Sequence, residues 1–172
     1  MELIAKRDAD VTPAERDLVS AWRDDCFGDQ AWTGGYTWEP PEWRLLLVDG
    51  GQPVSHLKIV TRRGTIAGDP VRLGGIGSVM TPTPFRGRGY ASELMRRAAG
   101  CMFDDLRVEL GLLFCLGRLV PFYRSLGWIE VESPVWIEQP AGRIRWLESA
   151  MVLPRPGAPW HDGEVDVRGL PW

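Results

Sequence analysis

The sequence lacks long hydrophobic runs. No window approaches the ~18 uninterrupted apolar residues that a membrane-spanning helix requires, so a membrane is not an expected partner. The segment Met1 to Asp8 turns charged before an apolar stretch develops, which predicts no secretory signal peptide. Cysteine is scarce. Cys26, Cys101 and Cys115 are odd in number and lack metal-ligand spacing, so they are typical of reduced thiols in a cytoplasmic protein without a metal site.

An excess of positive charge is also missing. The chain has 20 Lys and Arg residues against 23 Asp and Glu residues, which gives a formal net charge of -3. Binding to nucleic acid needs a basic stripe that neutralises phosphates, so we expect no nucleic-acid partner. The mild acidity is compatible with a cationic substrate.

What the chain does have suits one globular domain over residues 1–172. Hydrophobic residues make up 44% of the 172 positions, enough to bury a substantial core. No internal repeat, low-complexity tract or linker divides the chain. Nine tryptophans are more than usual, and most of them are expected to be core residues.

The first part of the chain predicts a strand over 2–6, a helix and then three strands. Thr12 and Glu15 form a capping box around Pro13, which marks a helix start. Residues 27–42 are rich in Gly, Pro and Trp and predict a long functional loop. Turn signals at residues 49–51 and 62–64 separate strands expected over 43–48, 54–61 and 71–81.

The second part alternates helices and strands. A helix follows Gly89, residues 110–116 predict a strand buried on both faces, and a short helix over 120–126 ends at Gly127. Further strands are expected over 128–132, 135–138 and 150–153. This order predicts an α+β or mixed α/β fold with a central, mostly antiparallel mixed sheet flanked by helices.

Two glycine-rich segments indicate a ligand site. Gly74, Gly75 and Gly77 lie inside an expected strand, where glycine marks a bulge or the close approach of a ligand or backbone. The turn from Pro82 to Gly89 then opens a helix, whose unpaired N–H groups and dipole form an anion site. It is neither a dinucleotide fingerprint, since a third glycine is missing, nor a Walker loop.

Arg86-x-x-Gly89-x-Ala91 resembles the pyrophosphate loop of GNAT acetyltransferases. Residues 79–81 resemble the family's pantetheine-binding strand, residues 112–115 its splayed strand, and residues 121–128 the helix and turn that follow. The resemblance implies the GNAT fold and acetyl transfer from acetyl-CoA to a primary amine of a small molecule. The implied acetyl-CoA-binding residues are Val79, Met80, Thr81, Arg86, Gly87, Arg88, Gly89, Tyr90 and Ala91.

The same resemblance places Tyr123 on the general acid. A tyrosine of pKa ~10 can protonate a thiolate of pKa ~8.5 when it lies within hydrogen-bond reach. The alternative for Tyr123 is a core aromatic residue. Backbone N–H groups near Met80 and Thr81 are the expected oxyanion donors, and a bulge would turn one of them inward.

No residue matches the general base. Many GNAT enzymes carry a strand glutamate near the position of Gly77, where this chain cannot supply one. The remaining candidates are His56, Glu39 and a terminal carboxylate on Trp172, or else the amine arrives neutral. A lone histidine within a strand, such as His56, is more often a structural residue.

The tail, residues 152–154 and 167–172, resembles that of aminoglycoside 2′-N-acetyltransferases. By this resemblance Trp38, Glu39 and Trp172 contact the acceptor, and Cys115 is a further candidate. Leu170 and Gly77 replace the acidic residues of those enzymes, so the cationic-sugar site is weakened. The tail is alternatively a hydrophobic plug. Three other possibilities stay open: a non-catalytic acetyl-CoA-binding domain, a longer acyl donor, and a homodimer.

Overall fold

The computed structural model describes residues 1–28 and 35–172, so the middle of the loop expected over 27–42 lies outside the described residues. The helices are α1 (Pro13–Phe27), α2 (Tyr90–Gly100) and α3 (Val120–Arg124). Short 3-10 turns are η1 (Asp8–Asp10), η3 (Thr83–Phe85) and η5 (Gly117–Leu119), and a π turn, η4 (Cys101–Asp105), extends α2.

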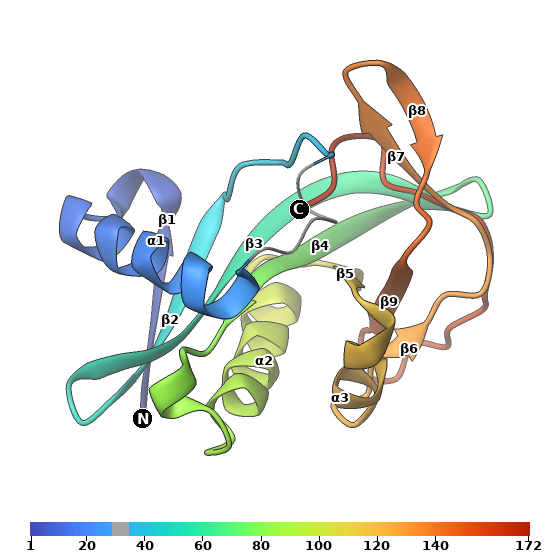
Figure 1. Ribbon diagram of the computed structural model, residues 1–172. Coiled ribbons are helices and arrows are strands. Elements are labelled where there is room, and N and C mark those ends of the chain that lie inside the picture. Colours follow the sequence, from blue (N-terminus) through green and yellow to red (C-terminus); the bar gives the residue numbers. More distant parts are fainter. Residues whose placement is uncertain (29–34) are drawn as a thin grey trace.

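Within the described ranges, ten strands form one mixed sheet (Figure 1). They are β1 (Glu2–Arg7), β2 (Trp43–Asp49), β3 (Gln52–Ile66), β4 (Asp69–Met80), β5 (Leu110–Cys115), β6 (Ile129–Glu130), β7 (Val135–Gln139), β8 (Gly142–Arg145), β9 (Ser149–Pro154) and β10 (Val165–Asp166). Their order is β6-β9-β5-β4-β3-β10-β7-β8, with β2 on the first part of β3 and β1 beyond it. Only the β4–β5 and β10–β7 pairs are parallel among the described pairings.

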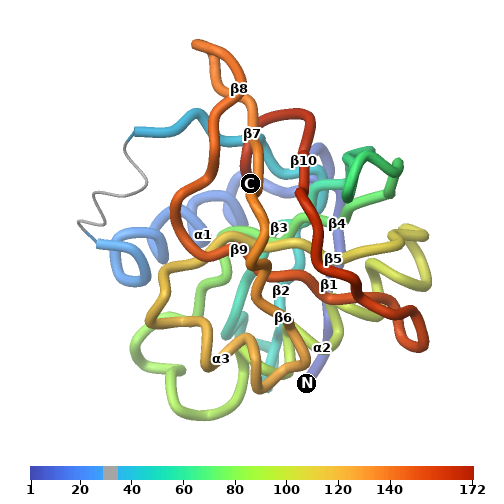
Figure 2. Tube along the Cα trace, turned by 90° about the vertical axis from the view of Figure 1, so that its right-hand side faces the viewer, coloured from blue at the N-terminus to red at the C-terminus, as the bar shows by residue number. Residues whose placement is uncertain are grey.

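Helices cover both faces of this sheet, as the fold class predicted. Leu45 and Leu47 point into the core cluster that contains α2 and α3, whereas Leu46 between them packs with Val19 and Trp22 of α1. We call these two sides the α2 face and the α1 face. Farther along the α1 face, β7, β10 and the C-terminal segment enclose a second apolar cluster, and β10 runs beside β7 (Figure 2).

Local signals located several elements correctly. The capping box of α1 is present: the Glu15 N–H donates to Thr12 Oγ1 at 3.3 Å, and the Thr12 N–H donates to the Glu15 carboxylate at 2.9 Å. All six residues of β5 are buried, as expected for a strand covered on both faces. Gly127, with φ +88°, follows α3.

The turn predicted at residues 62–64 is wrong, because β3 continues without a break to Ile66. Gly64 lies in extended backbone, where a Cβ would come within 2.5 Å of the Leu73 side chain, so its glycine reflects close packing. The chain turns instead at Ala67 and Gly68, whose φ angles are +49° and +90°. The short strands β8 and β10 were not predicted.

Candidate active site

The sheet opens between β4 and β5. These strands pair in parallel only from Leu73 opposite Leu110 to Ile76 opposite Leu113. Beyond that rung β4 continues to Met80 and β5 to Cys115, while β5 stays paired with β9 along its whole length. The facing backbone groups of the diverging ends are therefore available to a ligand.

A β-bulge lies at this opening. Lys58 of β3 pairs with Gly77, but His56, two residues earlier, pairs with Met80, so Ser78 and Val79 together oppose a single residue. Ser78 has a φ of +51°, which is uncommon for a residue other than glycine. The bulge directly precedes Met80 and Thr81, the expected oxyanion donors.

The bulge is held from β3. The His56 Nδ1–H donates to the Ser78 carbonyl at 3.1 Å, which requires the Nδ1–H tautomer because the carbonyl only accepts. Ser55 Oγ donates to the Met80 carbonyl at 2.9 Å and lies 2.9 Å from Thr81 Oγ1. The backbone between Ser78 and Thr81 is thereby fixed.

The glycine loop leads from η3 into α2. Gly87 and Gly89 have φ angles of +74° and +79°, and a Cβ on either would meet no atom within 4 Å. The first helical hydrogen bond runs from the Glu93 N–H to the Gly89 carbonyl at 3.0 Å. The N–H groups of residues 90–92 therefore lie ahead of the helical ladder, and the open space beside them fits an anionic ligand.

Arg86 bonds to backbone carbonyls beside this loop. Its guanidinium donates to the carbonyls of Thr81 and Asp25, each at 3.0 Å. The Asp25 carboxylate in turn accepts from the Thr83 N–H and hydroxyl, each at 2.7 Å, and these bonds followed by the Arg86 charge lower the Asp25 pKa. Sequence reasoning missed Asp25, which lies on α1 and fastens the loop from 58 positions away. These bonds of Arg86 help to hold the loop in place, and Arg88 is exposed.

Tyr90 also has a structural bond. Its hydroxyl donates to Asp49 Oδ2 at 2.6 Å, which ties the start of α2 to the β2–β3 hairpin. The bond with Asp49 raises the Tyr90 pKa. Ala91, next along the helix, is half-buried.

Tyr123 lies on α3, beyond the end of β5, in the apolar cluster of the α2 face. Its ring packs edge-on against Phe122 and Trp128, with centroids 5.0 and 6.4 Å away. Its hydroxyl has no hydrogen-bond partner in the part of the chain that the structure describes. Burial, and then the nearby Cys115, raise the Tyr123 pKa above its usual range, so the phenol stays protonated.

Cys115 lies on the α2 face in the same cluster as Tyr123. The structure therefore does not bring Cys115 together with the other predicted acceptor residues, which lie on the α1 face. The side chains of β5 alternate, and it is Phe114 that points to that side. Burial, and then Glu130, raise the pKa of the Cys115 thiol to about 12.

Trp172 fills the α1 face at the base of the opening. Its indole N–H donates to the Leu112 carbonyl at 3.2 Å, and only 3% of the residue is exposed. A Cβ on Gly75 would lie 1.9 Å from the indole, and one on Gly77 would lie 2.6 Å from the Trp172 carbonyl carbon. The strand glycines thus mark the close approach of Trp172.

Glu39 joins the loop before β2 to the C-terminal segment. Its N–H donates to the Pro171 carbonyl at 2.7 Å, and its carboxylate pairs with Arg62. Arg62 also donates to the Leu170 carbonyl at 2.9 Å. Trp38 lies in an aromatic group beside this tie, with its ring centroid 5.9 Å from Tyr36 and 6.0 Å from Trp146.

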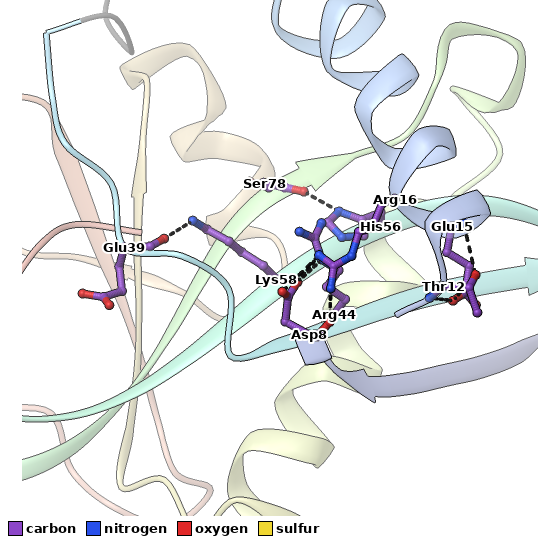
Figure 3. Close-up of polar contacts among 9 residues, drawn as sticks. All are labelled: Asp8, Thr12, Glu15, Arg16, Glu39, Arg44, His56, Lys58 and Ser78. Carbon is purple, nitrogen blue, oxygen red and sulfur yellow. Dashed lines mark hydrogen bonds and ion pairs between the residues drawn. The ribbon is translucent and has the colours of Figure 1, made fainter. Parts of the chain in front are cut away.

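His56 and Lys58 are buried on β3, and Figure 3 shows Glu39 at the far end of the Lys58 side chain. Desolvation lowers the pKa of His56 to about 3, so its imidazole is neutral, and its Nε2 has no partner among the described residues. Sequence reasoning missed Lys58, which no motif marks. Its Nζ donates to the Glu39 carbonyl at 2.7 Å. Burial, followed by repulsion from Arg44 and Arg23, lowers the Lys58 pKa to about 8.

A cavity of about 480 Å³ lies elsewhere, between the second half of α2 and β9, with Met95, Phe103, Trp128 and Leu153 in its wall. It is at the opposite end of α2 from the glycine loop. In residues 1–28 and 35–172, no three metal-ligating side chains come together. None of the described helices combines the length and apolar character needed to span a membrane.

The comparisons with known proteins agree with this geometry. The model of the GNAT acetyltransferase domain matches residues 10–131, so the chain belongs to the GNAT acetyltransferase family. Among curated proteins, none matches the chain significantly. The resemblance of the tail to aminoglycoside 2′-N-acetyltransferases is not confirmed.

Solved structures share the fold. ElaA of Escherichia coli is 16% identical with a TM-score of 0.63, over 88% of this chain and 97% of ElaA. An acyl-CoA N-acyltransferase from Pseudomonas aeruginosa is 18% identical with a TM-score of 0.60, over the same shares. A GNAT family acetyltransferase from Brucella melitensis in complex with acetyl-CoA is 15% identical with a TM-score of 0.55, over 95% of this chain and 94% of that one.

Proposed function

We propose that the protein transfers an acetyl group from acetyl-CoA directly to a primary amine of a small molecule, with Tyr123 as general acid. The observation that carries this proposal is the opening between β4 and β5. The glycine loop follows one diverging strand, and Tyr123 lies on the helix that follows the other. One ligand that extends from the loop into the opening would bring its thioester to the bulge.

The chain's residues fit this ligand. The open space at Gly87 and Gly89 and the N–H groups ahead of α2 suit a pyrophosphate. The unpaired edges of β4 and β5 suit the amide groups of a pantetheine arm, which hydrogen-bonds like a peptide. The Brucella melitensis relative with this fold binds acetyl-CoA, which supports the same donor here.

The surroundings of Tyr123 support its role as an acid. Cys115, a thiol in the same cluster, has its pKa raised to about 12 because burial disfavours the thiolate. A CoA thiolate that leaves in these surroundings is disfavoured for the same reason and needs a proton as the carbon–sulfur bond breaks. Tyr123 is a protonated donor in the same cluster.

The acceptor would approach on the α1 face, where Trp38, Glu39 and Trp172 lie. The Trp172 indole is already seated on Gly75 at the base of the opening, which leaves little space there and favours a short acyl group. The bond from the Glu39 N–H to the Pro171 carbonyl fixes the wall of this side.

A panel of primary amines with acetyl-CoA tests the proposal, with CoA release and the mass of the acetylated product as readouts. We expect acetylated product from at least one amine, and no release with Gly89→Asp. Acetyl-CoA binding without any product would instead indicate a non-catalytic binding domain. Faster release from longer acyl-CoA donors would contradict the choice of acetyl group.

A further inference from the structure

Lys58 reaches the opening between β4 and β5 from the neighbouring strand. It pairs with Gly77. Gly77 directly follows Ile76, which forms the last β4–β5 pair with Leu113. The Lys58 Cε lies 2.9 Å from the position of a Cβ on Gly77. The amine therefore projects across β4 on the α1 face, in the space that a side chain of residue 77 would occupy.

Lys58 is buried without an ion-paired side chain. Only 8% of the residue is exposed, and among the described residues no side-chain carboxylate of Asp or Glu lies within 4.0 Å of its Nζ. The nearby carboxylates are engaged elsewhere, Glu39 with Arg62 and Asp8 with Arg44. Burial of an unpaired ammonium is costly, so these surroundings favour the neutral amine.

We propose that Lys58 is the general base of acyl transfer and takes the ammonium proton of the acceptor at the mouth of the opening. This inference rests on the proposed function and supplies the base that the sequence left open. Of 20 basic residues only two are lysines, and the other, Lys6, is paired with Glu15 at 2.6 Å. An arginine at position 58 could not release its proton, whereas a buried lysine can.

The groups that face Lys58 agree with this role. Arg44 on β2 and Arg23 on α1 repel its charged form, and Glu39 from the loop favours it. On the same face of β3, His56 is neutral and lies two positions before Lys58, and Arg62 is paired with Glu39 and lies four positions after it. The main chain of Trp172 lies beside Lys58 over Gly77. With a pKa of about 8, roughly a tenth of Lys58 is neutral at pH 7 and about half at pH 8, close to the range in which a general base works best.

The proton balance is complete with these residues. Neutral Lys58 accepts one proton from the acceptor ammonium, and the free amine attacks the thioester carbonyl carbon. A carbon–nitrogen bond forms, the carbon–sulfur bond breaks, and the departing thiolate takes the Tyr123 proton. The second proton of the acceptor nitrogen returns to Tyr123 through solvent, and Lys58 releases its proton to water. The Glu39 carbonyl accepts one Nζ–H and so directs the lone pair away from itself.

The other candidate bases fit less well. His56 has its pKa lowered to about 3, and its Nδ1–H is held by the bulge, so it binds a proton too weakly near neutral pH. The Glu39 carboxylate is paired with Arg62. Lys58 alone among these three combines a usable pKa with a place over β4. The main chain of Trp172, whose carboxylate is the remaining candidate, lies beside Lys58 over Gly77.

The test has a readout that does not depend on turnover. Competitive acylation with trace acetic anhydride, read by mass spectrometry between about pH 6 and 11, follows each lysine separately, and Lys6 is the internal reference. We expect Lys58 to titrate near pH 8. Titration near the 10.5 of an ordinary lysine would overturn the proposal even if acetyl transfer is demonstrated.

Kinetics of Lys58→Met and Lys58→Arg then test the role itself, with Lys6→Met as the matched control. We expect both Lys58 variants to bind CoA normally and to lose about 10²- to 10⁴-fold in kcat/KM. In the wild type, kcat/KM should fall as the pH drops below about 8, and this acid limb of the pH profile should be absent from both variants. Trimethylamine, which cannot be acetylated, should partly restore Lys58→Ala. Near-normal activity of Lys58→Arg would show that only charge is needed, and an unchanged acid limb in Lys58→Met would equally overturn the proposal. If wild-type protein acetylates no amine, the proposed function fails first and the base role fails with it.

Discussion

The indole of Trp172 lies directly on the α-carbon of Gly75, at a rung where β4 and β5 are still paired. Gly75 pairs with Leu112, whose carbonyl accepts the indole N–H at 3.2 Å. The C-terminal residue thus bridges the two strands that separate one rung later. A side chain at position 75 and the indole cannot occupy this place together.

Gly75→Ala should therefore destabilise the protein, because its Cβ would lie 1.9 Å from the indole. We expect a loss of about 1–3 kcal/mol in the free energy of unfolding, measured with urea. In combination with Trp172→Ala the loss should be smaller than the sum of the two single losses. Gly100→Ala, where a Cβ meets nothing within 4 Å, is the control and should cost nothing. Strictly additive losses would contradict the contact.

Gly89→Asp should abolish measurable CoA binding, because it places a carboxylate beside the N–H groups ahead of α2. The substitution also strains a residue with φ +79°, so the control is Gly157→Asp, which has φ +84° and equally open surroundings. Calorimetry should show a loss for the first variant and normal affinity for the second. Normal affinity of a folded Gly89→Asp variant would remove the loop from the CoA site.

Tyr123→Phe should keep the fold and the CoA affinity but lower kcat by about 10²- to 10⁴-fold, since only the proton donor is removed. Its hydroxyl has no bond to lose among the described residues, so the melting temperature should hardly change. Tyr90→Phe is the contrasting variant: it removes the bond to Asp49 and should lower stability more than chemistry. A loss in Tyr123→Phe below ~3-fold, with chemistry rate-limiting, would return Tyr123 to a packing role.

His56 should lower the free energy of unfolding at acidic pH. Burial lowers its pKa from 6.5 to about 3, so between these values the unfolded chain binds a proton that the native protein does not. This contribution to stability is fully present above pH 6.5 and is lost as the pH falls toward 3. Between pH 7.5 and 4.5 we expect it to amount to about 2–3 kcal/mol.

The matched variant is His56→Asn, which keeps an N–H donor for the Ser78 carbonyl but does not titrate in this range. Its free energy of unfolding should depend less on pH than that of the wild type. His161→Asn, at an exposed position, should behave like the wild type. An identical acid dependence in His56→Asn would show that other groups cause the loss.

Local chemistry was readable from the sequence. The Thr12 capping box, the buried β5 run and the turn at Gly87 and Gly89 that opens α2 each depend on residues a few positions apart, and the structure confirms all three. Gly64 led to a wrong turn prediction at residues 62–64, because its role depends on a residue far away in the sequence. Its extended backbone is required by Leu73 on the neighbouring strand, a contact that local turn signals do not report.

The site was readable only in part. Glu39 lies next to Trp172 in the structure, because its N–H bonds to the Pro171 carbonyl, but Cys115 faces the other side of the sheet because the side chains of β5 alternate. Asp25 and Lys58 were missed, since the first matters through Thr83 and the second through its register with Gly77. Such pairings are set by tertiary structure, and no spacing within one segment encodes them.

The seat of Trp172 has a consequence for how the chain folds. The indole bonds to a residue 60 positions earlier, and Leu170 bonds to Arg62 across 108 positions. Closing loops of this length costs entropy before the contacts repay it, and topologies rich in such contacts fold slowly. Until residues 167–172 pack against it, the glycine-rich surface of β4 is exposed to water and to other chains. We therefore expect the protein to be most prone to aggregation while it is being synthesised and folded.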